Sequence, residues 1–387
     1  MKPGVAPGWK APSSLYIHIP FCPYKCPYCD FATYVGGDAL VEPYVQATCA
    51  EIERQSAPFP GHALDTVYFG GGTPSMLTAR QIGAILTAVQ RGFGIRDGAE
   101  ISIEANPDSV DAARLAGYRA AGINRLSIGV QSMDGEELEH LGRGHVPEDV
   151  RMVTRLGRSA GFDNISLDLI YGTPRQTMKS WAETLATALT LEPDHLSLYS
   201  LIVEPGTRFN RMQAKGTLKL PEDDLVADMY TFACDRLRDG FEHYEVANWA
   251  RDGRRSAHNI NYWLNEQFFA VGVGAYDYLR PYRAVRVRST KRYIEAMRLG
   301  HDGIAHRDLV DSELERFETA IMRLRLLNEG LDRGVFRERF GESLDARYSA
   351  VLGELVSLGF IDDDGETIRL RESMVPLANE AWERFLP

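Results

Sequence analysis

The sequence has no long apolar run and no excess of basic residues. None of its 387 residues belongs to an apolar segment long enough to cross a membrane, and the opening MKPGVAPGWKAPSS lacks the apolar core of a signal peptide. Lysine and arginine number 43 against 54 aspartate and glutamate, a formal net charge of -11. Nucleic-acid and anionic-membrane binders need a basic surface. We therefore expect a cytoplasmic protein with no integral membrane segment and no nucleic-acid partner.

Cysteine is also scarce, and its placement is uneven. There are five cysteines. Cys49 and Cys234 stand alone in helical patterns and are expected to be buried thiols. The other three lie within eight residues, in the order Cys22, Cys26 and Cys29. In a reducing compartment such a group predicts a metal site rather than disulfides.

The spacing C-x-x-x-C-x-x-C favours one kind of metal site. Three thiolates can hold three irons of a cubane iron–sulfur cluster and leave the fourth iron open to a small molecule. The alternative is a zinc site, structural or catalytic. Zinc knuckles usually come as paired C-x-x-C units, and the sequence has no second pair. The pattern therefore favours the iron–sulfur cluster.

β-rich runs alternate with helical patterns through the first half of the chain. The expected strands are 14–20, 64–69, 100–104, 125–130, 164–170 and 195–203. Six strand–helix units in succession predict an α/β fold with a parallel sheet and helices outside. Six are too few for an eight-fold barrel, so we expect an open, partial (β/α)6 barrel.

Polar residues follow the ends of these expected strands. The cysteine loop follows the first strand and Gly70 to Thr73 the second, while Glu104, Gln131 and Asp168 lie at the ends of the next three. In parallel α/β architectures the chemistry sits at the carboxyl ends of the strands. These residues should therefore meet in one site.

The pattern changes after about residue 220, and we divide the chain into 1–220, 221–305 and 306–387. The middle part extends the barrel and contains the segment HNINYW, 258–263. The basic stretch 280–292 is expected to be a solvated or substrate-facing strand pair. The last part predicts three helices, a hairpin around 363–365 and a closing helix, typical of a mainly helical, winged-helix-like domain. Because the chain is acidic, a lid or partner surface is favoured over DNA binding.

Several motifs together carry a resemblance to a known family. LYIHIPFC, CPYCDF, GGGTPS, EANP, NRLSIGVQS, LSLYSL and HNINYW occur in this order between Ser14 and Tyr278. They resemble the radical S-adenosylmethionine superfamily and, within it, the coproporphyrinogen III dehydrogenase-like branch with its heme chaperone group. The resemblance implies a [4Fe-4S] cluster on the three cysteines, S-adenosylmethionine bound at its open iron, and an electron donor for the cluster.

The resemblance also implies which residues hold the cofactor. One S-adenosylmethionine would be held by Tyr16, Gly71 and Glu104. A second would be held by Tyr28, Gly72, Thr73, Gln131, Arg143 and Asp168. Purely structural roles stay open for some of them, since the glycines suit any tight turn and Glu104 is placed to cap the helix expected near Ser109.

Two departures separate this sequence from the dehydrogenase it resembles. Phe31 stands where that enzyme has a further cysteine, and the first strand begins near residue 14, which leaves no room for a long segment over the active site. HNINYW instead matches the heme chaperone group, in which His258 would ligate heme iron beside Tyr262 and Trp263. The alternative is a histidine that caps a turn and packs structurally. We expect a protein that binds heme and passes it to an acceptor protein; the alternative is a radical enzyme acting on coproporphyrinogen III or a similar substrate.

Overall fold

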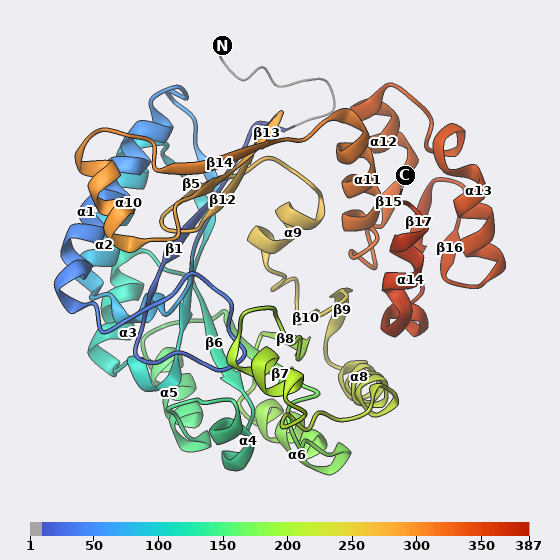
Figure 1. Ribbon diagram of the computed structural model, residues 1–387, viewed down its shortest axis with the longest axis horizontal. Coiled ribbons are helices and arrows are strands. Elements are labelled where there is room, and N and C mark those ends of the chain that lie inside the picture. Colours follow the sequence, from blue (N-terminus) through green and yellow to red (C-terminus); the bar gives the residue numbers. More distant parts are fainter. Residues whose placement is uncertain (1–9, 387) are drawn as a thin grey trace.

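The computed structural model describes residues 10–386, and its centre is a nine-stranded sheet of order β11-β1-β4-β5-β6-β7-β8-β10-β9 (Figure 1). Its six inner strands are parallel, as predicted. They are β1 (Ser14–Ile19), β4 (Leu64–Gly71), β5 (Ile95–Ala105), β6 (Arg125–Gln131), β7 (Ile165–Tyr171) and β8 (His195–Ser200). The predicted α/β fold with a partial barrel is confirmed.

The edges of the sheet are formed by strands from the segment after residue 221. β11 (Phe269–Val271) pairs in parallel with β1, whereas β10 (Asn248–Ala250) runs antiparallel to β8 and pairs with β9 (Glu242–Glu245). Sequence patterns indicated a short strand near 244–249 but not β11. Its three residues are all buried, so no alternation marks it as a strand.

Helices cover the outside of the sheet (Figure 1). The helix α2 begins at a capping box, in which Thr78 and Gln81 bond each other's backbone N–H groups, as its sequence predicts. The helices of this layer are α1 (Asp38–Ser56), α2 (Ala79–Gly92), α3 (Ala112–Ala121), α4 (Gly135–His140), α5 (Pro147–Ser159), α6 (Met178–Leu189) and α8 (Asp223–Leu237). None of the helices in residues 10–386 is long and apolar enough to span a membrane.

Strand alternation separates the apolar core from the interior of the barrel. In β6, Leu126, Ile128 and Val130 are fully buried in the core, and the residues between them are polar or glycine. Successive side chains of a strand point to opposite faces. The outer face therefore packs against helices, and the inner face presents polar groups.

A second small sheet lies beside the first. It contains β12 (Tyr276–Leu279), β13 (Tyr282–Arg286) and β14 (Ile304–Leu309), and the helix α10 (Thr290–Arg298) follows β13. The basic stretch 280–292 is thus one strand and a helix start rather than a strand pair. Arg286 is fully buried and pairs with Glu51 at 2.9 Å and Asp277 at 2.6 Å, so this part of the stretch is structural.

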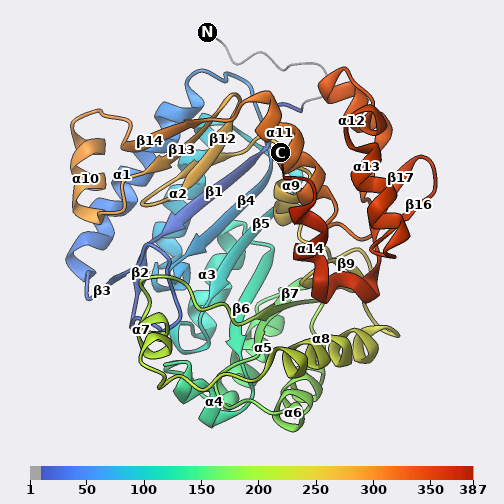
Figure 2. The ribbon, with the colours of Figure 1, turned by 45° about the vertical axis from the view of Figure 1, so that its right-hand side comes forward.

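The last part of the chain packs around its own apolar cluster (Figure 2). The predicted hairpin is present, with its turn at 364–366. The elements are α11 (Ser312–Arg323), β15 (Leu331–Asp332), α12 (Arg333–Phe340), α13 (Leu344–Ser357), β16 (Ile361–Asp363), β17 (Thr367–Leu370), η3 (Glu372–Leu377) and α14 (Ala378–Glu383). The helix α9 (Ala257–Trp263), which carries HNINYW, contacts α11.

Candidate functional site

A cavity of about 420 Å³ opens at the carboxyl ends of the inner strands. Figure 2 shows β2 (Phe21–Cys22) beside these ends. The lining of the cavity contains nearly all of the predicted site residues. They are Cys22, Cys26, Tyr28, Cys29, Gly71, Gly72, Thr73, Glu104, Gln131, Arg143 and Asp168. Ligand sites commonly have this volume. Tyr16 and His258 are the two predicted residues that do not line the cavity.

The cysteine loop places three half-buried thiols at one side of this cavity. Oγ1 of Thr73 donates to Sγ of Cys22 at 3.5 Å, and Nη1 of Arg143 donates to Sγ of Cys26 at 3.8 Å. Burial raises the pKa of Cys22 to about 11, so a bound cation is needed to hold its thiolate at neutral pH. Three sulfurs, two of them with hydrogen-bond donors beside them, fit an iron–sulfur cluster.

Glu104 faces the cavity and contacts the glycine turn after β4. Its Oε2 accepts from the backbone N–H of Gly71 at 3.1 Å, and its Oε1 accepts from the hydroxyl of Tyr68 at 2.9 Å. Removal from water raises the pKa of Glu104 to about 7. Asp111, not Glu104, caps the following helix, so a capping role for Glu104 does not hold.

Gly71 permits the close approach that this turn requires. Its φ is 112°, and a Cβ there would lie 2.5 Å from the ring of His18. An L side chain is therefore strained by the backbone and blocked by the ring. The turn needs glycine at this position. Its backbone N–H groups are bonded within the protein, that of Gly71 to Glu104 and those of Gly72 and Thr73 to the carbonyls of Ile19 and Phe21 at 2.8 Å.

A β-bulge at the end of β6 turns Gln131 toward the cavity. The register of β6 against β7 shifts between Gly129 and Gln131, and Gln131 has a φ of 66°. Such a conformation is uncommon for a residue other than glycine and is found at functional sites. The irregularity supports a binding role for Gln131.

Arg143 connects several parts of the cavity wall. Its Nη2 donates to Oδ1 of Asn106 at 2.7 Å and to the carbonyl of Gly129 at 3.0 Å. Asn106 in turn donates to Oγ1 of Thr73 at 3.2 Å. Nε of Arg143 is buried without a protein partner. A buried N–H without a protein acceptor can donate a hydrogen bond to a ligand oxygen.

Asp168 lies deeper in the cavity, among hydroxyl groups. It accepts from Ser127 at 2.9 Å and from Ser166 at 3.3 Å. Burial raises its pKa, while these hydroxyls and that of Ser197 oppose the rise. Sequence reasoning missed these serines, and it missed Tyr68, Asn106 and His195. All of them except Ser166 line the cavity. The signal was present: RLSIGVQ, SLD and HLS place polar residues at every second position of apolar strands.

Tyr16 lies beside the cavity-lining Tyr68 but does not itself line the cavity. Its hydroxyl is 3.2 Å from Nδ1 of His18, and its ring stacks against that of Tyr68 with centroids 6.2 Å apart. The position is next to Gly70, where a Cβ would lie 2.9 Å from the Tyr16 ring. Tyr16 therefore supports the turn and Tyr68, and its contact with a cofactor stays a prediction.

The contacts of His258 favour the structural alternative over a heme ligand. Its ring is buried, with Nδ1 2.7 Å from the hydroxyl of Thr66 and Nε2 2.7 Å from that of Tyr262. Burial lowers its pKa to about 3. Trp263 instead lies under the guanidinium of Arg325, 4.2 Å from its ring centroid. Because both nitrogens of His258 are engaged, neither is open to an iron, and the structural alternative fits.

Comparisons with known proteins agree with this geometry. Residues 16–188 match the model of the radical SAM superfamily, and residues 310–373 match the HemN C-terminal domain. The heme chaperone HemW of Bacillus subtilis is 38% identical over 96% of this chain and 99% of its own length. The chain belongs to the HemW family of radical SAM proteins.

Other relatives extend the likeness over nearly the whole chain. HemW of Escherichia coli is 34% identical over 97% of this chain and 98% of its own. Among solved structures, coproporphyrinogen III oxidase (HemN) from Escherichia coli, a radical SAM enzyme, superposes with a TM-score of 0.84 at 25% identity. That match covers 97% of this HemW-family chain and 90% of the other. Both the barrel and the C-terminal part are therefore shared.

Proposed function

We propose that this protein is a heme chaperone that holds a [4Fe-4S] cluster and S-adenosylmethionine, binds heme and transfers it to an acceptor protein. The observation that carries the proposal is the full-length likeness to proteins named heme chaperone, 38% over 96% of the chain. The acceptor and the electron donor for the cluster are protein partners that the proposal requires. A reducing compartment such as the cytoplasm suits the free thiols.

One group of cavity residues is suited to hold the cluster. When bound, the cluster would be a source of electrons for S-adenosylmethionine held in the same cavity. Cys22, Cys26 and Cys29 supply the three thiolates, and Thr73 and Arg143 donate to two of the sulfurs. A hydrogen bond or positive charge beside a sulfur stabilises its negative charge.

The organic part of S-adenosylmethionine finds complementary groups across the cavity. Glu104 can accept from its ammonium or ribose, and the unpartnered Nε of Arg143 can donate to its carboxylate. Gln131 and Asp168 can hydrogen-bond ribose or a second molecule. These residues and Tyr28, Gly72 and Thr73 line one cavity, which supports a shared binding site for one or two molecules.

The rim of the same cavity offers a place for heme. Phe31, Tyr199 and Ile202 line it and are 59%, 43% and 67% exposed. Exposed apolar side chains gathered at a cavity mark a binding surface, and aromatic rings stack on flat π-systems. We place the porphyrin on this rim, where it can be delivered and released without opening the core around His258.

The second candidate function is decarboxylation of coproporphyrinogen III. The HemN likeness favours it, but Phe31 occupies the position of the extra cysteine of that enzyme. Anaerobic assay of cluster-loaded protein with coproporphyrinogen III and S-adenosylmethionine separates the two functions. Turnover would replace the chaperone proposal; we expect none.

Heme titration of the same protein tests binding directly. We expect a saturable change in heme absorbance, with an affinity at least about tenfold lower in Phe31→Glu and Ile202→Glu, because burying a charge against the macrocycle costs more than about 1.4 kcal/mol. Leu299→Glu is the control, since Leu299 is 55% exposed but does not line the cavity. An absent heme signal would contradict the function. Unchanged affinity in both rim variants would contradict only the rim as its site.

A further inference from the structure

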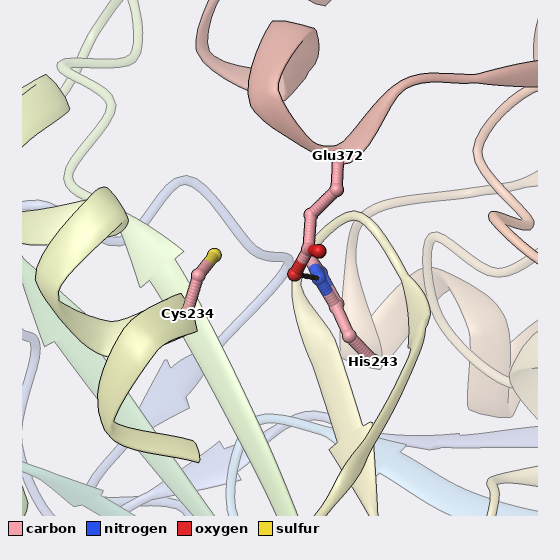
Figure 3. A group of neighbouring side chains, drawn as sticks. All are labelled: Cys234, His243 and Glu372. Carbon is pink, nitrogen blue, oxygen red and sulfur yellow. Dashed lines mark hydrogen bonds and ion pairs between the residues drawn. The ribbon is translucent and has the colours of Figure 1, made fainter. Parts of the chain in front are cut away.

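A second group of metal-ligating side chains lies far from the cysteine loop in the sequence (Figure 3). Cys234 comes from α8, His243 from β9 and Glu372 from η3. Their ligand atoms all lie within 4.8 Å of one another. Figure 3 shows the Cys234 sulfur pointing toward the paired His243 and Glu372. Thiol, imidazole and carboxylate from three elements thus converge on one point.

The imidazole of His243 is held in one orientation. Its ring stacks on Trp249 with centroids 4.1 Å apart and planes 11° from parallel. Nε2 lies 3.2 Å from the hydroxyl of Tyr230 and 3.4 Å from the carbonyl of Val246. Metal-ligating histidines usually donate their other N–H to such an oxygen. That tautomer leaves the lone pair of Nδ1 facing the carboxylate.

Nδ1 of His243 lies only 2.9 Å from Oε1 of Glu372. If the ring proton is on Nε2, both of these atoms are acceptors, so a proton or another cation must lie between them. A proton makes the pair an imidazolium–carboxylate ion pair. A metal ion would instead draw in the nearby thiol and displace its proton. The ion pair leaves the thiol of Cys234 without a role. A metal ion explains why all three side chains converge.

The ligand set and its spacing suit zinc. Zinc binds sulfur, nitrogen and oxygen at about 2.0–2.3 Å in a tetrahedron, so its ligand atoms are roughly 3.5 Å apart. The ligand atoms lie up to 4.8 Å apart, so one of them must move by about one ångström to reach this spacing. Glu372 can supply it because its side chain is 48% exposed. A cavity beside the three residues leaves room for water as a fourth ligand.

Neighbouring groups are compatible with a bare ion but not with a macrocycle. Arg238 borders the same cavity, but its charge is paired with Asp235 at 2.8 Å. One face of the His243 ring is covered by Trp249, and Cys234 is only 7% exposed. A heme disc therefore has no flat surface to lie on, whereas an ion needs only the space between the three atoms.

We propose that Cys234, His243 and Glu372 form a site for a zinc-type divalent ion that ties η3 of the C-terminal part to α8 and β9 of the barrel. η3 already packs against α8. A bound ion adds a coordination link at this contact and stabilises the docked arrangement of the two parts. The site is independent of the cysteine loop and of the proposed heme function.

The experiment titrates zinc ion into cluster-loaded protein under anaerobic conditions, in competition with a chromophoric chelator. Loading the cluster first keeps zinc away from Cys22, Cys26 and Cys29, and the brown absorbance reports that the cluster survives. We expect one equivalent of zinc on the wild type and an affinity at least about tenfold lower in Cys234→Ser and in Glu372→Gln. Cys49→Ser is the control, because Cys49 is the other isolated cysteine and is half-buried. This variant should bind zinc as the wild type does.

A thermal melt gives a second measurement on the same samples. Zinc should raise the Tm of the wild type and of Cys49→Ser, but not that of the two site variants. Glu372→Gln keeps the test valid if Cys234→Ser folds poorly, because Glu372 is half-exposed. Absence of a zinc equivalent on the wild type would overturn the proposal. Equal zinc binding in both site variants, or a loss of heme rather than zinc binding, would do the same.

Discussion

Nη1 of Arg143 lies 3.8 Å from Sγ of Cys26, at the wall where the cysteine loop meets the end of β6. This contact sets a fixed positive charge next to a cluster sulfur. Potentials of iron–sulfur clusters depend on nearby charge and on hydrogen bonds to the sulfurs.

Removing that charge should make the cluster harder to reduce. In Arg143→Met we expect the cluster to assemble but its reduction potential to fall by on the order of 50 mV, because the reduced cluster loses a charge-assisted hydrogen bond. An anaerobic redox titration followed by electron paramagnetic resonance measures the shift. Arg151→Met, on an exposed position of α5, is the control. An unchanged potential in Arg143→Met would show that the contact with Cys26 does not persist in the loaded protein.

Each cysteine of the loop should be required for the cluster. Cys22→Ala, Cys26→Ala and Cys29→Ala should each lose the brown chromophore after reconstitution, since a site with two thiolates leaves another iron without a protein ligand. Cys49→Ala should keep it, because Cys49 lies in α1, where it packs against the core and contacts the carbonyl of Ala84. Iron and sulfide analysis, together with absorbance spectra, measures the cluster content of each variant. Full cluster content in all three loop variants would contradict the ligand assignment.

Much of this site could be predicted because strand position carries geometric information. Glu104 and Gln131 lie at the carboxyl ends of β5 and β6, and Asp168 lies on the neighbouring strand β7. In a parallel sheet the carboxyl ends of such strands meet at one edge. The cysteine loop and the glycine turn follow the same rule. Their shared cavity is a consequence of topology, which periodicity alone predicts.

The contacts that sequence reasoning did not find have the opposite origin. His258 is engaged by Thr66, which lies 192 residues earlier in the sequence, and no local pattern shows that a strand hydroxyl will meet its ring. The same holds for Cys234, whose burial was predicted but whose neighbour Glu372 comes from the far end of the chain. Long-range contacts of single side chains depend on tertiary packing and leave no periodic signal.

Glu104 should make stability fall as pH rises. Its pKa is raised from 4.5 to about 7 in the folded protein, so between these values the folded chain keeps a proton that the unfolded chain has lost. Unfolding then releases a proton, and the free energy of unfolding decreases with increasing pH over this window. Glu104→Gln stays neutral and should gain on the order of 3 kcal/mol relative to the wild type between pH 4.5 and pH 7.

Urea unfolding of both proteins at several pH values measures this difference. Tyr68 donates to Glu104 and Asp168 adds a nearby carboxyl, but both residues are common to the two proteins, so the comparison isolates Glu104. A difference in stability that does not change between pH 4.5 and pH 8 would show that the carboxyl ionises in the folded protein at its ordinary pKa.

His258 should matter for folding rather than for heme. In His258→Ala the hydroxyls of Thr66 and Tyr262 lose their partner and a cavity forms beside Tyr68, so we expect a loss of about 2–4 kcal/mol in the free energy of unfolding. Thr66→Val removes one of the two hydrogen bonds and should cost about 1 kcal/mol. Heme affinity per folded molecule should be that of the wild type in both variants, measured by titration below the unfolding transition. A loss of heme binding in His258→Ala but not in Thr66→Val would restore the histidine as a ligand, and it would require α9 to move so that Nε2 leaves Tyr262.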